Sequence, residues 1–466
     1  MNENGKSMST GKRINQDIIL IFLLSFAVLS AYVLLHLRFM REDVDDAWTL
    51  SFFYNLLVRH IPPEATFGGG LASPHFFGMT QAYIYSFLLN ITGWTKGNAH
   101  WISSFLMAAA AAMWYLIARK LNFQLYNAVL FALMILWCDP FFREANLARP
   151  ESLTFFLVSL SFMLFLYKKP FLSGLSVMVA FENHPMGLFA LIFIVAYLIS
   201  NHDFLSHFSK NFLLLPALFI AGLACGTAYF LVLHFPYLDE IYKSIKIASN
   251  SRSYSVLEDY FFHFIARLHI FVFIFFLVCL VAFLIRKGWK DYPFIVYLLL
   301  LSILVNFINH RDNYHYTLYF YVSFLFLSFF CLEGTKWRRA APIVLFFIVS
   351  LNYGYAMLHN RSFDFNKKIF LLKSYVPNDR LAVLGSPDEW FAFIGRDFYA
   401  STYTHSFDTN SINFYNIEDD PYRNNDNSSG GHREYKAYLK THYTAKPVTN
   451  FTVNGENYDI FLLHKR

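Results

Sequence analysis

Hydrophobic positions in this chain gather in long blocks that are separated by short polar segments. A helix that crosses the hydrocarbon core of a bilayer needs roughly 20 predominantly apolar residues, and most of the blocks approach that length. They run over 17–37, 99–118, 124–140, 151–167, 171–183, 185–200, 212–234, 268–285, 292–309, 314–332 and 340–358. The pattern predicts a multi-pass α-helical membrane protein with about eleven transmembrane helices.

One further apolar segment, 76–94, decides the orientation of everything that follows it. Lysine and arginine concentrate in the cytoplasmic loops of membrane proteins. Here they form short clusters between the blocks, at 119–120, 168–169, 210, 286–290 and 336–339. If 76–94 lies on the outer surface, every cluster is cytoplasmic, and if it spans the membrane, every cluster lies outside. We therefore expect an interfacial or re-entrant helix with Gln81, Tyr83 and Tyr85 on a partly polar face.

The last hundred residues have a different pattern, with apolar runs of only strand length. Segments 381–385 and 460–463 read as strands, and 387–394 reads as a helix between them. The composition of 419–434 is that of a loop. The sequence thus predicts a cytoplasmic N-terminal tail over 1–16, a transmembrane domain over 17–358 with a first outer loop at 39–98, and a small extracytoplasmic α/β domain over 359–466.

Composition supports the membrane class and excludes nucleic-acid binding. The chain has 466 residues, of which 56% are hydrophobic, 20% aromatic and 15% charged. Its net charge of +6 comes from the clusters between apolar blocks and forms no continuous basic patch. The four cysteines lie within or at the ends of apolar blocks, so no disulfide framework or zinc site is expected. The many phenylalanines fit helix packing, although a groove for an isoprenoid tail would use the same residues.

An acidic cluster directly follows the first apolar block. Four carboxylates fall within five residues, in the sequence Glu42-Asp43-Val44-Asp45-Asp46. Because aspartate at the centre of a membrane helix costs roughly 2.5–3.5 kcal/mol, the cluster must lie at or outside the interface. We expect it to face water and a cationic or hydroxyl-bearing ligand. The alternative is an ordinary solvated acidic loop.

Other polar residues that could take part in catalysis or binding fall on the same predicted side. The second outer loop carries Arg143, Glu144, Arg149 and Glu151, the third carries Glu182, Asn183 and His184, and the fifth carries His310, Arg311, Asp312 and His315. Since the orientation was set by basic residues on the opposite side, this segregation is partly independent support for an outward-facing site.

The order of these parts resembles the membrane glycosyltransferases of the GT-C fold, and most closely the protein mannosyltransferase and aminoarabinose transferase relatives. The motifs that carry the resemblance are Asp45-Asp46-Ala47-Trp48, Ala72-Ser73-Pro74-His75, Arg149-Pro150-Glu151 and His184-Pro185. The resemblance implies transfer of a sugar from a polyprenyl-phosphate donor to a glycan, lipid or protein acceptor. It implies a bacterial inner membrane, with the active site facing the periplasm or exterior.

The resemblance also implies roles for individual residues. Asp45 or Asp46 corresponds to the general base, and Glu151, or else Glu144, to a second acidic position. The chain has glutamate where the mannosyltransferases have aspartate, and Ser73-Pro74-His75 where they have His-Pro-Pro. The sugar and the acceptor of those relatives are therefore not carried over, while His75 stays a candidate for substrate binding.

An inverting transfer needs a carboxylate to take the proton of the acceptor hydroxyl and a positive group for the leaving phosphate. We favour Asp46 as the base, with Asp45 or Asp43 orienting it. These three carboxylates are also the candidate ligands of a divalent cation, Mg²⁺ or Mn²⁺, although the cluster lacks a defined ligand spacing. The sequence identifies no other cofactor.

Arg149 is the first candidate for the donor phosphate, because a guanidinium offers planar, bidentate donors. The alternative is a salt bridge from Arg149 to Glu144 or Glu151. His310 and Arg311 form a second candidate pair, with interfacial capping as the alternative. His184 either binds substrate or packs at a broken helix, where freed backbone groups need partners.

Two other function classes stay open: a transporter or flippase for a lipid-linked glycan, and a non-catalytic subunit of an envelope-glycan complex. Transporters place ionisable groups near the bilayer midplane. The blocks 212–234, 292–308 and 340–358 contain no Asp, Glu, Lys or Arg. This favours chemistry at the outer surface over passage through the membrane.

Overall fold

The structure is a computed structural model. It describes residues 4–38, 44–60, 78–200, 210–239, 270–287, 317–333, 335–360, 364–379, 381–400, 413–419 and 438–466.

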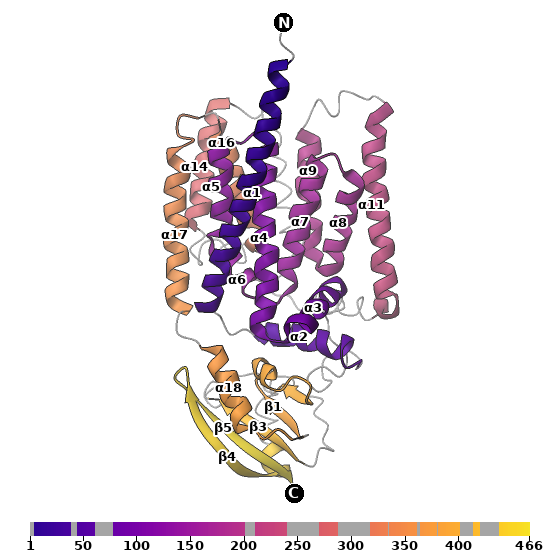
Figure 1. Cartoon of the computed structure of the whole chain (residues 1–466), viewed down its shortest axis with the longest axis vertical. Coiled ribbons are helices and arrows are strands. Elements are labelled where there is room, and N and C mark those ends of the chain that lie inside the picture. Colours follow the sequence, from indigo (N-terminus) through magenta and orange to yellow (C-terminus); the bar gives the residue numbers. More distant parts are fainter. Residues whose placement is uncertain are drawn as a thin grey trace.

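Long helices run side by side and form a bundle (Figure 1). They are α1 (Asn4–Arg38), α4 (Lys96–Lys120), α5 (Leu125–Leu136), α7 (Pro150–Leu166), α8 (Pro170–Asn183), α9 (Phe189–Ser200), α11 (Lys210–His234), α14 (Ile270–Lys287), α16 (Thr317–Leu332) and α17 (Ala340–Asn360). Each predicted apolar block overlaps one of these helices, except the block 292–309, which lies outside the described residues. Helix α1 also begins well inside the predicted N-terminal tail.

Within the described part of the chain, three helices are long and apolar enough to cross a membrane alone: Gln16–His36, Lys96–Lys120 and Leu214–His234. A fourth span results if α5 and α6 (Asp139–Ala145), which meet at 59°, count together. Shorter apolar stretches of 10–17 residues lie in α7, α9, α14, α16 and α17. The total of about eleven spans therefore stays a prediction.

Small residues let helices of the bundle approach closely. Gly174 of α8 and Gly222 of α11 face each other's helix, and a Cβ on Gly222 would lie 2.0 Å from the backbone oxygen of Phe171. On α4 the alanines at 110 and 111 are fully buried. Such contacts stabilise helix pairs in lipid, where hydrophobic burial between helices contributes little.

Aromatic side chains fill the interior of the bundle. The indole of Trp114 on α4 packs against Phe131, Phe162, Phe193 and Phe326, with ring centroids between 5.1 and 6.2 Å apart. These phenylalanines come from α5, α7, α9 and α16. These phenylalanines thus pack between helices, which is the role that the sequence analysis favoured for this residue type.

Two short helices, α2 (Val44–Leu57) and α3 (Met79–Thr92), lie at one end of the bundle, next to the C-terminal domain (Figure 1). At 14 residues, α3 is shorter than the roughly 20 residues that a span requires. This length and position agree with the interfacial interpretation of segment 76–94.

The C-terminal domain is a five-stranded mixed sheet flanked by α18 (Phe365–Tyr375) and the 3₁₀ helix η7 (Pro387–Ala392). Its strands are β1 (Ala382–Gly385), β2 (Phe398–Ala400), β3 (Asn413–Asp419), β4 (Tyr443–Val453) and β5 (Glu456–Lys465), in the order β2-β1-β3-β5-β4. Strand β1 pairs in parallel with β2 and β3, and β5 pairs antiparallel with β3 and β4. The small sheet was predicted, and the predicted helix is a 3₁₀ turn.

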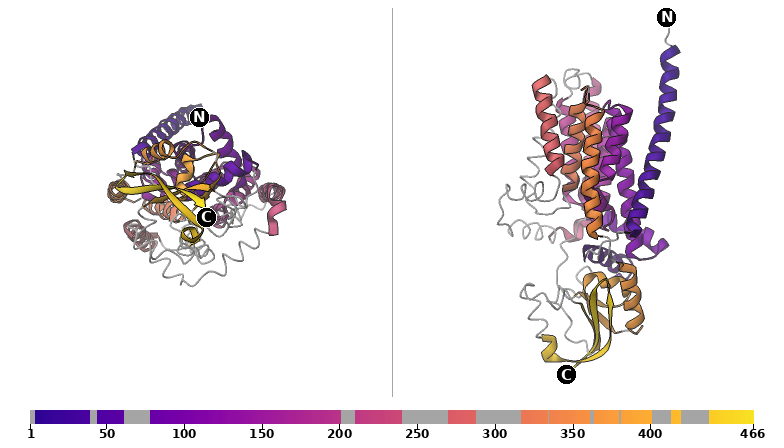
Figure 2. Two further views of the ribbon diagram at one scale, coloured as in Figure 1. Left: turned by 90° about the horizontal axis from the view of Figure 1, so that it is seen from below. Right: turned by 90° about the vertical axis from the view of Figure 1, so that its left-hand side faces the viewer.

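The basic loops and the C-terminal domain lie at opposite ends of the bundle. Arg119 at the end of α4 pairs with Asp17 of α1 at 3.6 Å, and Lys120 lies over the ring of Tyr167 at the end of α7. The start of α4 lies at the other end, beside α2 and the C-terminal domain (Figures 1 and 2). The predicted orientation requires this separation.

Candidate active site

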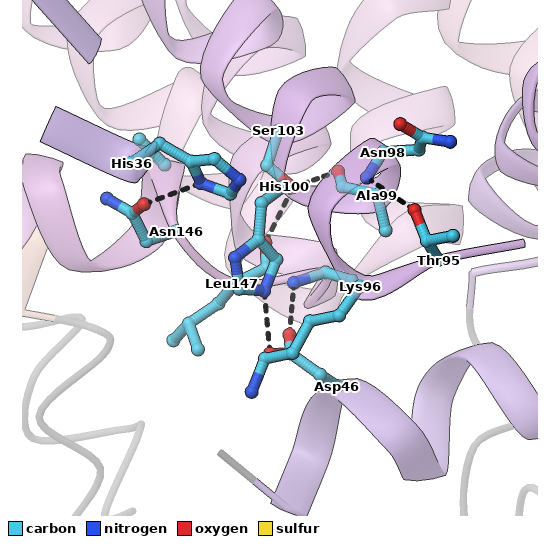
Figure 3. A network of polar contacts seen from close by, with 12 residues as sticks. His36, Asp46, Thr95, Lys96, Asn98, Ala99, His100, Ser103, Asn146 and Leu147 are labelled. Atoms are coloured by element: carbon cyan, nitrogen blue, oxygen red, sulfur yellow. Dashed lines mark hydrogen bonds and ion pairs between the residues drawn. The ribbon is translucent and has the colours of Figure 1, made fainter. Parts of the chain in front are cut away.

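Asp46 is the centre of a buried polar network at the end of the bundle that faces the C-terminal domain (Figure 3). It lies in the first turn of α2 and is fully buried. Its Oδ2 lies 2.7 Å from Nε2 of His100 and 3.4 Å from Nζ of Lys96. Its Oδ1 accepts a hydrogen bond from the backbone N–H of Ala148. Asp46 therefore links α2 with α4 and with the segment before α7.

The expectation that the acidic cluster faces water is wrong for Asp46. A buried carboxylate is stable only when it is paired and hydrogen-bonded, and here two side chains and one backbone N–H satisfy it. The side chains of Asp43 and Asp45 lie outside the described residues, so their predicted roles stay predictions.

The local sequence of α4 explains how Lys96 and His100 reach the same carboxylate. Residues four apart lie on one face of a helix, and Thr95 caps the helix by accepting from the N–H of Asn98 at 3.1 Å. One turn later, Ser103 donates to the backbone oxygen of Leu147 at 2.6 Å. The start of α4 thereby holds the 145–148 segment that supplies the N–H for Asp46.

Electrostatics keep Asp46 ionised. Burial alone raises the pKa of this carboxyl, but the neighbouring His100 and Lys96, with the hydrogen bonds from His100 and Ala148, hold it below its usual value. Lys96 is itself 1% exposed, and its ammonium group lies 4.4 Å from the ring centroid of Phe365 on α18. The lysine is thus enclosed between the acidic helix and the C-terminal domain.

His36, at the end of α1, completes the network. Its Nδ1 lies 2.8 Å from Oδ1 of Asn146, and its ring is edge-on to that of His100 with centroids 4.9 Å apart. Among the described residues, Nε2 of His36, Nδ1 of His100 and Nζ of Lys96 have no hydrogen-bond partner although they are buried. Such atoms cost about 1–3 kcal/mol each when left unsatisfied, and a polar ligand would satisfy them.

The structure brings the Arg149 motif next to Asp46, because Arg149 directly follows Ala148. Arg149 forms a two-point salt bridge with Glu151, with Nε 3.2 Å from Oε2 and Nη2 3.0 Å from Oε1. This is one of the salt bridges expected as the alternative to phosphate binding. Arg149 precedes Pro150 at the start of α7, where a negative residue in the first turn favours the helix dipole.

The other predicted site residues are distributed differently. Glu144 is buried on α6, and His184 accepts from the N–H of Met186 at 3.2 Å, a contact that agrees with the packing alternative. The substrate-binding roles of both residues stay predictions. His75, His310 and Arg311 lie outside the described residues, and their roles stay predictions.

Glu182 is the centre of a second buried polar cluster. The sequence analysis predicted an outer loop for this residue and assigned it no role. Its Oε1 lies 2.8 Å from the N–H of Met79 and 2.9 Å from Nε2 of His234, and its Oε2 accepts from the hydroxyl of Thr80. The carboxylate therefore caps the N-terminus of α3 and joins α3, α8 and α11.

The predicted divalent cation at Asp43, Asp45 and Asp46 stays a prediction, because the side chains of Asp43 and Asp45 lie outside the described residues. Among the described residues, no three His, Cys, Asp or Glu side chains lie close enough to share a metal ion. The ammonium of Lys96 beside Asp46 would also repel a cation.

Sequence reasoning missed His36, Lys96 and His100. The signal that could have indicated Lys96 and His100 is their spacing of four residues, one helical turn, at the predicted outer end of the apolar block 99–118. His36 had no comparable signal, because only the fold brings the end of α1 to the start of α4.

The chain matches no protein-family model and no curated protein. Among solved structures, the crystal structure of ArnT from Cupriavidus metallidurans bound to undecaprenyl phosphate superposes with a TM-score of 0.59 and 10% sequence identity, over 95% of this chain and 97% of that chain. The chain has the fold of ArnT.

The apo state of ArnT gives the same result, with a TM-score of 0.58 and 11% identity over 96% of this chain and 98% of that chain. ArnT is an aminoarabinose transferase of the GT-C fold, so the fold expected from the resemblance is confirmed. At this low identity the likeness to ArnT concerns the fold, and it includes both the helical bundle and the C-terminal domain.

Proposed function

We propose that the protein is a membrane glycosyltransferase that moves a sugar from a polyprenyl-phosphate donor to an acceptor hydroxyl on the outer face of the membrane. The observation that carries the proposal is the buried Asp46 with Lys96 and His100, at the junction of bundle and C-terminal domain in a chain with the ArnT fold. The ArnT crystal structure with undecaprenyl phosphate supports a polyprenyl carrier.

The network contains the groups that such a transfer requires. The acceptor oxygen attacks the anomeric carbon, the bond from that carbon to the phosphate oxygen breaks, and the Asp46–His100 pair removes the hydroxyl proton. Lys96, whose ammonium is buried without a hydrogen-bond partner among the described residues, stabilises the negative charge that develops on the leaving phosphate. We place Lys96 before Arg149 for this role, because Lys96 has a loose ion pair with Asp46 at 3.4 Å, whereas the fork of Arg149 makes two hydrogen bonds to Glu151.

The placement of charge favours chemistry at the surface over transport. The buried charged residues of the described bundle are Asp46, Lys96, Glu144, Glu151 and Glu182. They belong to α2, the start of α4, α6, the start of α7 and the end of α8, all at the end near the C-terminal domain (Figure 1). A transporter would instead place such groups near the midplane of the bundle.

An apolar cavity of about 320 Å³ offers a place for the isoprenoid tail. It lies between α1, α5 and α17, and Leu35, Trp137, Tyr353 and Gly354 contribute to its lining. Leu35 directly precedes His36, so the cavity and the polar network share the end of α1. An apolar cavity of this kind suits the tail of an isoprenoid lipid.

The experiment has two steps. Mass spectrometry of envelope lipids and glycans, with and without the gene, identifies the sugar that disappears. The purified protein in detergent is then given the corresponding polyprenyl-phosphate sugar. Transfer with release of polyprenyl phosphate supports the proposal, and an unchanged set of glycans together with no transfer from any polyprenyl-phosphate sugar contradicts it.

A further inference from the structure

His100 has one ring nitrogen engaged and one unused. Nε2 lies 2.7 Å from Oδ2 of Asp46. An ionised carboxylate can only accept hydrogen bonds, so Nε2 carries the proton and Nδ1 is a bare acceptor in the neutral ring. Nδ1 is buried and has no hydrogen-bond partner within the described part of the chain. Figure 3 shows this second nitrogen on the side of His36, away from Asp46 and Lys96.

Asp46, by contrast, is already occupied. One oxygen interacts with His100 and Lys96, and the other accepts from the backbone of Ala148. A carboxylate can accept about four hydrogen bonds, so a hydroxyl could reach only the remaining lone pair of Oδ1. Nδ1 of His100, by comparison, accepts from no donor among the described residues.

His36, whose ring contacts that of His100, has a bare nitrogen of its own. Its Nδ1 lies 2.8 Å from Oδ1 of Asn146, an amide oxygen that only accepts, so the proton is on Nδ1 and Nε2 is unprotonated. This Nε2 is also buried without a partner among the described residues, and the two rings are edge-on at 4.9 Å. A hydroxyl group has one O–H, so it can donate to Nδ1 of His100 or to Nε2 of His36, but not to both at once.

We propose that His100 is the catalytic base that removes the hydroxyl proton, and that Asp46 is the positioning residue that fixes its tautomer and stabilises the imidazolium. This inference rests on the proposed function. As the acceptor oxygen bonds to the anomeric carbon, its proton moves to Nδ1 of His100, and the electron pair of the broken carbon–oxygen bond leaves on the phosphate. The ligand class that would donate to Nδ1 of His100 is an alcohol, namely the acceptor hydroxyl.

The test compares His100→Asn and His100→Gly with the wild type, with His442→Asn as the matched control. His442 is an exposed histidine of the C-terminal domain, far from the network in the fold. Loss of a general base lowers kcat roughly 10²- to 10⁴-fold, while binding of polyprenyl phosphate alone stays within about threefold. His442→Asn keeps wild-type turnover. Size-exclusion chromatography shows which variants are folded.

Chemical rescue distinguishes a base from a packing residue. Added imidazole restores turnover of His100→Gly, whereas pyrazole, which has the same shape but is a much weaker base, does not. Near-normal turnover of folded His100→Asn overturns the inference, and so does equal rescue by pyrazole. If His100→Gly does not fold, the turnover of His100→Asn decides alone. Retained transfer by the His100 variants with loss in Asp46→Asn would reject His100 as base and leave the proposed function intact.

Discussion

At the scale of single residues, buried carboxylates at one end of the bundle have different partners and hence different roles. Asp46 pairs with Lys96 and His100, and Nδ1 of His100 has no hydrogen-bond partner in the described structure. Glu182 pairs with backbone N–H groups of α3 and with His234. The first arrangement has capacity for a ligand, and the second caps a helix.

We expect Glu182→Gln to lower stability and leave the chemistry at Asp46 in place. The amide puts a donor where the carboxylate accepts from α3, which costs about 1–3 kcal/mol of the free energy of unfolding. Thermal unfolding in detergent measures the effect. Glu456→Gln is the control, because Glu456 is partly exposed and accepts from the hydroxyl of Tyr458 at 2.7 Å, a bond that the amide oxygen of glutamine can also accept. Equal midpoints for the two variants would contradict the capping role.

At the scale of elements, the hydrophobic pattern predicted the helices because each block must bury its backbone polar groups in lipid. It also predicted the strands at β1 and β5, since runs of that length cannot span. The hydrophobic pattern could not show that α2 lies at the end of the bundle and that Asp46 is buried there. That position depends on contacts between distant segments, such as the ring contact of Tyr54 with Trp390 at 6.0 Å and the Arg59–Asp397 pair at 2.8 Å.

Two glycines in helices of the bundle differ in the space around them, so the same substitution to alanine can be compared at both positions. A Cβ on Gly222 would lie 2.0 Å from a backbone oxygen of α8, whereas a Cβ on Gly354 meets nothing within 4 Å. We expect Gly222→Ala to separate α8 from α11 and to lower the unfolding midpoint. Gly354→Ala should be neutral or stabilising, since alanine is favoured over glycine in a helix by about 1 kcal/mol. The reverse order of midpoints would contradict the packing of α8 on α11.

At the scale of the whole molecule, the bundle separates basic loops at one end from the acidic network and the C-terminal domain at the other (Figure 2). The sequence predicted this separation from loop charge alone. It did not reveal that Phe365 of the C-terminal domain covers Lys96, because a cation–π contact between residues so far apart in sequence leaves no periodic signal.

The predicted orientation leads to a labelling experiment. In a variant without the four native cysteines, a cysteine at position 446, exposed on β4, should react in intact cells with a membrane-impermeant maleimide. A cysteine at position 287, at the end of α14, should react only after the membrane is opened. Labelling of position 287 from outside would reverse the orientation, including the interfacial reading of α3.

The central claim is that Asp46 organises the chemistry of sugar transfer, and turnover of Asp46→Asn by the purified protein tests it most directly. Asp139→Asn is the control, because Asp139 forms an ion pair with Arg143 at 2.7 Å on the neighbouring α6, outside the network. We predict that Asp46→Asn loses transfer roughly 10²- to 10⁴-fold while the folded protein still binds polyprenyl phosphate, and that Asp139→Asn transfers normally. Near-normal turnover by Asp46→Asn would contradict the account.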